Sequence, residues 1–254
     1  MKLDKIILFI FSLIRKKNYK EIETNLFVKK VSAFTKIEEQ INPNSNKTYF
    51  ILSGWYESSN HSKKFKKRIK KQKNSYIFYQ LSKDILSSRA NQVKEYMKEI
   101  KNKIIKDLKN TKNEKIIIGT SLGGIPSFMI TNELRVNKLI LLMPSDSLAQ
   151  GVWEGLRTQN IKKSFIKQGI KLKKLKILWK ELEPQNNLKN LEKTKIIIFN
   201  SKSDLIIPYK RSYNLIKEMH KKRIYPKVYT NKNIGHYLTA LKFYNSKKSF
   251  DLIH

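Results

Sequence analysis

Cysteine is absent from this 254-residue sequence. The absence excludes a disulfide framework, a thiolate metal site and a cysteine nucleophile, so any nucleophilic chemistry rests on another residue type. Glycine and proline are also few, at eight and six residues. A collagen-like or low-complexity chain is therefore excluded, and a hydrophobic content of 40% is ample for a folded core.

Acidic residues are scarce. The sequence has 20 Asp and Glu against 54 Lys and Arg, a formal net charge of +34, and only seven of the basic residues are Arg. A/T-rich codons explain abundant Lys, Ile and Asn, but they do not explain the shortage of acids. The electric field of a protein with this net charge attracts anionic partners at low ionic strength. Nucleic acid is not the expected partner, because no helix-turn-helix, zinc-finger or RNP-like pattern is present.

Long hydrophobic runs are missing as well. The longest near the N-terminus, residues 6–14 (IILFIFSLI), is roughly half of the ~20 residues that span a bilayer. Basic residues follow it where a signal peptide would have a small-residue cleavage site. We expect residues 1–30 to form an uncleaved segment that packs on the domain or rests on a membrane. The expected location is cytoplasmic, with peripheral membrane contact as the alternative.

Short apolar runs predict the strands of one domain, residues 31–254. They occur at residues 31–37, 48–52, 76–81, 115–118, 138–143, 195–199 and 226–230. Most are continuous rather than alternating, which is typical of strands covered on both faces. The fold class is therefore α/β, a mostly parallel sheet flanked by helices.

Helical periodicity fills the segments between these runs. Apolar residues three or four apart predict a helix over residues 84–110, capped by Ser82 or Asp84, and further helices over 122–134 and 209–220. Residues 145–190 show no strand and are expected to form an inserted helical cap. Inside the cap, residues 161–180 form a basic amphipathic pattern interrupted near Gly169.

A nucleophile motif stands between a predicted strand and a predicted helix. Gly119-Thr120-Ser121-Leu122-Gly123 matches G-x-S-x-G. In that motif the serine occupies a strained turn that projects its hydroxyl above the sheet. Alone the pentapeptide is compatible with an ordinary glycine-rich turn, but its strand-turn-helix setting favours the catalytic interpretation.

A serine hydroxyl needs a base and an acid to become nucleophilic at neutral pH, and both candidates come later in the chain. Asp204 follows the predicted strand 195–199, at the end where catalytic groups collect in α/β sheets. His236 lies in the loop after the last predicted strand. The alternatives are a turn or helix-capping role for Asp204 and a surface or capping role for His236.

The order Ser121, Asp204, His236 resembles the α/β-hydrolase superfamily, over roughly residue 48 to the C-terminus. The resemblance implies an α/β-hydrolase fold, with Ser121 as nucleophile, His236 as general base and then general acid, and Asp204 orienting the imidazole. Asp146, after the strand 138–143, is the reserve acid, because some members place the acid there.

The resemblance also implies an oxyanion hole. One donor is the backbone N–H of Leu122, and the second comes from the loop Ser53-Gly54-Trp55 after the strand 48–52. Many members carry His-Gly there, whereas this chain has Ser-Gly. A backbone donor is still available, so Trp55 N–H is the expected second donor, and Gly54 and Trp55 are expected to contact substrate. The Trp55 side chain alone is equally compatible with a core role.

No H-E-x-x-H, Walker or G-x-G-x-x-G motif occurs, so we expect neither a metal nor a cofactor. The predicted function is a serine hydrolase that cleaves a small-molecule carboxylic ester through an acyl-enzyme. The alternatives are a thioesterase, or a non-catalytic protein that binds a membrane or polyanion on a hydrolase scaffold. Basic residues concentrate in the stretches 61–73 and 161–180. The apolar face of 161–180 either packs over the active site as a cap, with its lysines in solvent, or joins the N-terminal segment in contact with an anionic membrane.

Overall fold

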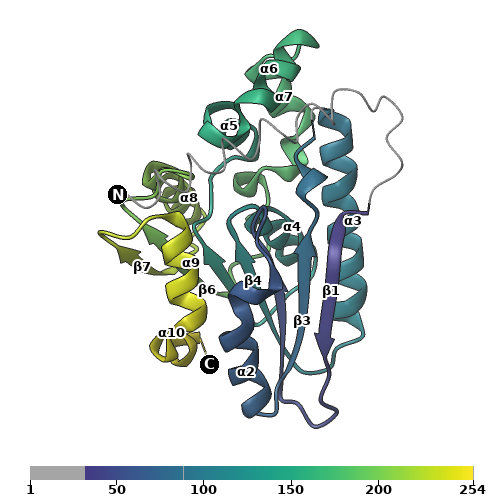
Figure 1. Ribbon diagram of the computed structural model, residues 1–254, viewed down its shortest axis with the longest axis vertical. Helices are drawn as coiled ribbons and strands as arrows, with labels where there is room; N and C mark the ends of the chain where they lie inside the picture. Colours follow the sequence, from purple (N-terminus) through teal and green to yellow (C-terminus); the bar gives the residue numbers. More distant parts are fainter. Residues whose placement is uncertain (1–31, 88, 254) are drawn as a thin grey trace.

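A computed structural model describes residues 32–87 and 89–253. The expected N-terminal segment, residues 1–30, lies outside the described residues. The described chain forms a seven-stranded sheet in the order β1-β3-β2-β4-β5-β6-β7. Every neighbouring pair is parallel except β1 with β3. Figure 1 shows β1 running opposite to β3 at one edge of the sheet.

All seven predicted strands are present, with ends shifted by at most three residues. They are β1 (Phe34–Gln40), β2 (Lys47–Leu52), β3 (Ser75–Leu81), β4 (Glu114–Thr120), β5 (Lys138–Leu142), β6 (Lys195–Ser201) and β7 (Lys227–Asn231). The helices are α2 (Lys63–Lys71), α3 (Ala90–Lys109), α4 (Gly124–Glu133), α5 (Leu148–Glu154), α6 (Gln159–Lys167), α7 (Leu172–Leu178), α8 (Tyr209–Lys221), α9 (His236–Asn245) and α10 (Lys247–Ile253).

Side chains of the central strands alternate between two hydrophobic cores. On β2, Phe50 and Leu52 join the core under α3, α4 and α8, whereas Tyr49 and Ile51 join the core under α2, α9 and α10. All four are fully buried. Covering both faces explains why the apolar runs are continuous rather than alternating.

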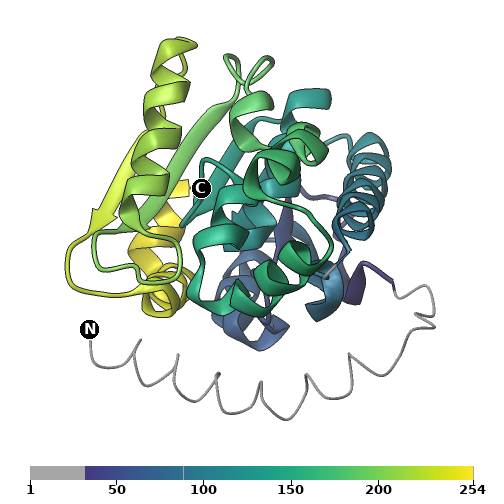
Figure 2. The ribbon, with the colours of Figure 1, turned by 90° about the horizontal axis from the view of Figure 1, so that it is seen from above.

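The segment between β5 and β6 contains α5, α6, α7 and short 3-10 turns, and no strand among its described residues. We refer to residues 145–190 as the cap. Figure 1 shows its helices above the ends toward which the parallel strands point, and Figure 2 shows them from above, between α3 and α8. Trp179 anchors the cap: it is fully buried and its Nε1 donates to the Ala90 carbonyl of α3 at 2.8 Å.

Two helical predictions meet different outcomes. The amphipathic stretch 161–180 is interrupted as expected, because Gly169 lies between α6 and α7 with φ of 67°. The predicted helix over 84–110 is wrong at its start, since Ser82 caps only the 3-10 turn η2 (Lys83–Ile85) and α3 begins at Ala90. Leu86, with ψ of 74°, is not helical and separates this turn from α3.

Within the described ranges, no helix is both long and apolar enough to cross a membrane.

Candidate active site

Ser121 occupies the sharp turn between β4 and α4. Its φ of 51° is left-handed, a strained conformation for a residue with a side chain. The turn is possible because its flanking glycines lack side chains: a Cβ on Gly119 would lie 2.4 Å from Ser127 Oγ, and one on Gly123 would lie 2.6 Å from the Leu52 carbonyl oxygen. The G-x-S-x-G spacing therefore follows from the close approach of strand and helix.

Asp204 and His236 form a buried hydrogen-bonded pair. The His236 Nδ1 lies 2.6 Å from Asp204 Oδ2, and the two side chains are 6% and 2% exposed. The other Asp204 oxygen, Oδ1, accepts the backbone N–H groups of Ile206 and Ile207, each at 2.8 Å. A carboxylate only accepts hydrogen bonds, so a proton on Nδ1 is directed to Asp204, and the neutral imidazole in this tautomer has its acceptor nitrogen at Nε2.

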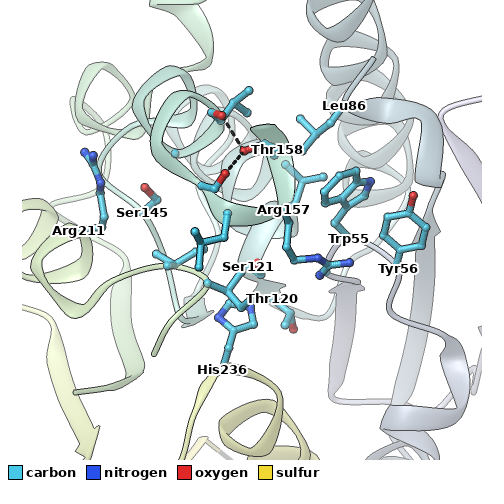
Figure 3. A pocket seen from close by; sticks show the side chains of 18 of the residues that line it. Trp55, Tyr56, Leu86, Thr120, Ser121, Ser145, Arg157, Thr158, Arg211 and His236 are labelled. Carbon is cyan, nitrogen blue, oxygen red and sulfur yellow. Dashed lines mark hydrogen bonds between the residues drawn. The ribbon is translucent and has the colours of Figure 1, made fainter. Parts of the chain in front are cut away.

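A cavity of about 530 Å³ opens beside this pair. Ser121, His236, Leu122, Gly54 and Trp55 all line it, and Figure 3 shows Ser121 and His236 at the same end. Much of the remaining wall is aliphatic, from the segment before α3, the cap, α4 and the loop after β6: Leu86, Ile125, Leu148, Val152, Leu156, Leu205, Ile206 and Ile207. The fold thus places five residues named from the sequence around one apolar cavity.

The loop after β2 shows why serine is compatible with the place where many α/β-hydrolases have histidine. Ser53 is fully buried, its Oγ accepts the Leu81 N–H at 2.9 Å, and its own N–H donates to the Tyr79 carbonyl at 3.0 Å. Both bonds tie the loop to β3. Trp55 is held by a bond from its Nε1 to the Lys83 carbonyl at 2.7 Å, so its side chain is fixed at the cavity wall.

Asp146, the reserve acid, has other partners. Its Oδ1 lies 3.2 Å from Arg211 Nη1 and its Oδ2 accepts Asn214 Nδ2 at 3.1 Å. The acid bonded to His236 is Asp204.

Four charged residues of the cavity wall were not predicted from the sequence: Glu57, Glu154, Arg157 and Arg211. Glu57 lies just after the loop Ser53-Gly54-Trp55, and Arg157 extends from the cap. The Arg157 guanidinium lies 5.2 Å from the Trp55 ring centroid and donates to the Tyr237 hydroxyl, an arrangement visible in part in Figure 3. An acid three residues after the loop glycine was the available signal for Glu57, whereas nothing local marks Arg157. Among the described residues, no group of three or more His, Asp or Glu could hold a metal ion.

Comparison with protein families gives a match over most of the chain. Residues 56–245 match the model of the Uncharacterised protein family (UPF0227). The chain belongs to this family. The match includes the serine turn, Asp204, His236 and the cap, and it begins just after the loop Ser53-Gly54-Trp55. No curated protein matches the chain in sequence.

Solved structures resemble this UPF0227 member in fold. The capsule O-acetyltransferase of Neisseria meningitidis serogroup A has a TM-score of 0.62 at 17% identity, over 85% of this chain and 89% of that one. Est1E from Butyrivibrio proteoclasticus has a TM-score of 0.57 at 14% identity, over 80% and 88%. A lipase-esterase related protein from Clostridium acetobutylicum has a TM-score of 0.56 at 16% identity, over 86% and 97%. The protein therefore has the α/β-hydrolase fold expected from the sequence.

Proposed function

We propose that this protein is a serine hydrolase that cleaves a small-molecule carboxylic ester through an acyl-enzyme. The observation that carries the proposal is the hydrogen-bonded Asp204–His236 pair at the cavity that Ser121 also lines. Esterases among the structures of similar fold support the same class of chemistry. The apolar wall favours an acyl group without charge.

In the proposed mechanism, Ser121 Oγ attacks the ester carbonyl carbon while His236 Nε2 takes its proton. The backbone N–H groups of Leu122 and Trp55 stabilise the oxyanion of the tetrahedral intermediate. The C–O bond to the alcohol then breaks, and the alcohol leaves with the proton from His236. Water repeats the sequence on the acyl-enzyme, releasing the acid and restoring Ser121. Asp204 holds the imidazole in the required tautomer.

Active-site labelling tests the proposal directly. A fluorophosphonate should modify the wild-type protein on Ser121, while Ser121→Ala should remain unlabelled and lose hydrolysis of short-chain p-nitrophenyl esters. Ser203→Ala is the matched control, because Ser203 is half-buried, does not line the cavity and has its hydroxyl bonded to the Lys232 carbonyl. Labelling or turnover that persists in Ser121→Ala contradicts the assignment.

Acyl transfer to an alcohol is a second candidate. An O-acetyltransferase is among the structures of similar fold, and the acyl-enzyme above is equally attacked by an alcohol. Incubation of the acyl-enzyme with graded concentrations of a simple alcohol separates the two, because a transferase forms ester at the expense of free acid. A thioester substrate uses the same residues and is distinguished by comparing matched esters and thioesters.

The cap supports a further proposal, peripheral contact with an anionic membrane. Residues 159–180 carry eight Lys and no Asp or Glu. Ile166 and Ile177 project from this stretch with 52% and 68% of their surface exposed, and Leu156, 63% exposed, also lines the cavity. Exposed aliphatic side chains among lysines favour a lipid surface over nucleic acid. This contact would place the cavity of a cytoplasmic enzyme near membrane lipids.

A further inference from the structure

The loop after β2 closes on itself through Glu57. The Gly54 N–H donates to Glu57 Oε2 at 2.6 Å, and the Glu57 N–H donates to the Gly54 carbonyl oxygen at 3.1 Å. Inside this turn Tyr56 has a left-handed φ of 63°, which is strained for a bulky residue. Trp55, the proposed second oxyanion donor, lies within the same turn. The Glu57 side chain therefore helps to hold the backbone that carries this donor.

Glu57 also stands close to the proposed nucleophile and base. It lines the cavity together with Ser121 and His236. A Cβ built on Gly54 would lie 3.2 Å from Glu57 Oε2 and 3.5 Å from Ser121 Cβ, so the carboxyl and the serine flank the same glycine. A positive charge on His236 lowers the pKa of Glu57.

Only one oxygen of the Glu57 carboxyl accepts a hydrogen bond within the described residues. Oε2 accepts the Gly54 N–H, whereas Oε1 is buried and has no hydrogen-bond partner there. Burial raises the pKa of Glu57 to about 7, against the lowering effects of the Gly54 N–H and of His236. Near neutral pH this carboxyl is divided between its neutral and charged forms.

Other ionisable groups surround the same space. They are Tyr244 of α9, whose pKa is raised by burial and by the charge of Glu57, His61 beside the loop, and, on the far wall, Arg157 and the ion pair Arg211–Glu154. Arg211 is paired with Asp146 and Glu154, and the charged group that lowers the pKa of Glu57 is His236 when it is protonated.

We propose that Glu57 is a positioning residue of this site. Its side chain fixes the orientation of the Trp55 N–H through the closed turn, and its carboxylate stabilises the protonated imidazole of His236. The inference rests on the proposed serine-hydrolase function. The ionised carboxylate accepts a stronger bond from the Gly54 N–H and attracts the imidazolium that forms during acyl transfer. Turnover should therefore rise as Glu57 loses its proton.

Carbon-13 NMR of glutamate carboxyl groups tests the contact without relying on activity. One carboxyl should titrate near pH 7 in the wild-type protein, disappear in Glu57→Gln and persist in Glu192→Gln, which removes an exposed acid elsewhere. In His236→Gln the same signal should move to higher pH, because a positive charge that favours the ionised form is gone. A Glu57 signal that titrates near pH 4.5, or that ignores His236→Gln, overturns the electrostatic part.

Kinetics test the effect on the oxyanion loop. Glu57→Gln retains an acceptor for the Gly54 N–H, whereas Glu57→Ala does not, so kcat should fall at least tenfold further in the alanine variant while KM changes little. The pH profile of kcat should include the ionisation of Glu57 near pH 7 in the wild-type protein and in Glu192→Gln. In Glu57→Gln this ionisation should be lost, and any remaining rise belongs to the general base. Equal kcat in both Glu57 variants, or an unchanged profile, overturns the positioning role.

If Ser121 is never acylated, the proposed function fails, while the carboxyl titration still decides whether Glu57 faces His236.

Discussion

Arg211 of α8 pairs with Asp146, its Nη1 lying 3.2 Å from Asp146 Oδ1. Arg211 also pairs with Glu154, so it joins α8 to the cap at two positions. Two acids thus stand after two neighbouring strands, and only one of them, Asp204, is bonded to His236.

This arrangement predicts a large difference between two matched substitutions. Asp204→Asn should lower kcat about 10⁴-fold, because the amide no longer holds the imidazole in the tautomer that accepts the serine proton. Asp146→Asn should change kcat little and should lower thermal stability slightly through the weakened Arg211 contact. Ester hydrolysis and thermal unfolding of both variants provide the measurement. The opposite ranking of kcat would transfer the acid role to Asp146.

The serine turn predicts opposite effects at two glycines that lie on either side of Ser121. Gly119→Ala should destabilise the fold by about 1 to 3 kcal/mol, since its Cβ would meet Ser127 Oγ at 2.4 Å and the Gly123 carbonyl oxygen at 2.8 Å. Gly124→Ala meets only Leu141 Cδ2 at 3.7 Å, in a helix, and should be neutral or stabilising by up to about 1 kcal/mol. Urea unfolding of the two variants measures the difference, and equal stabilities would contradict the packing described for the turn.

The cavity wall predicts a change in acyl-chain preference. Val152 is 2% exposed in α5 and lines the cavity, so Val152→Phe should fill part of the space that an acyl chain occupies. We expect kcat/KM for octanoyl esters to fall at least about tenfold relative to acetyl esters. Val228→Phe, at an exposed position on β7, is the matched control and should leave the ratio unchanged. An unchanged ratio in Val152→Phe would mean that the acyl group lies elsewhere.

The cap predicts salt-sensitive binding to anionic vesicles. Each Lys near such a surface contributes on the order of 1 kcal/mol, and the attraction fades within a Debye length. Replacing four cap lysines by Gln should weaken sedimentation with anionic vesicles: Lys171, Lys173, Lys174 and Lys176. A control with the same change in net charge replaces four lysines of α2: Lys64, Lys67, Lys70 and Lys71.

The control distinguishes a specific surface from a general charge effect. Equal loss in the two quadruple variants, or equal binding to anionic and zwitterionic vesicles, would leave codon-driven lysine enrichment as the better explanation of the +34 charge. Ile177→Asn should also weaken binding if the cap enters the interface, because that side chain is 68% exposed among the lysines.

The sequence predicted an element correctly wherever a local pattern of residues was enough to determine it. Continuous apolar runs such as residues 115–118 predicted the strands, because strands covered on both faces need no polar alternation. It was less informative at the ends of elements, such as the start of α3. There the apolar spacing typical of a helix begins at residue 84, but Leu86 has a non-helical backbone and α3 begins only at Ala90. Glu57 was missed because its place depends on a turn that only three-dimensional contacts define, namely the bonds to Gly54 and the proximity of Ser121.

The position of His236 at the start of α9 has a consequence for protein synthesis. The Arg68 guanidinium of α2 donates hydrogen bonds to the carbonyls of Tyr244 and Asn245 at the other end of α9. The Tyr244 hydroxyl is hydrogen-bonded to the hydroxyl of Thr120, next to Ser121. Ser121 leaves the ribosome long before α9 can dock on these partners. The growing chain would then carry the proposed nucleophile without its proposed base, so the proposed activity would begin only when the last helices assemble.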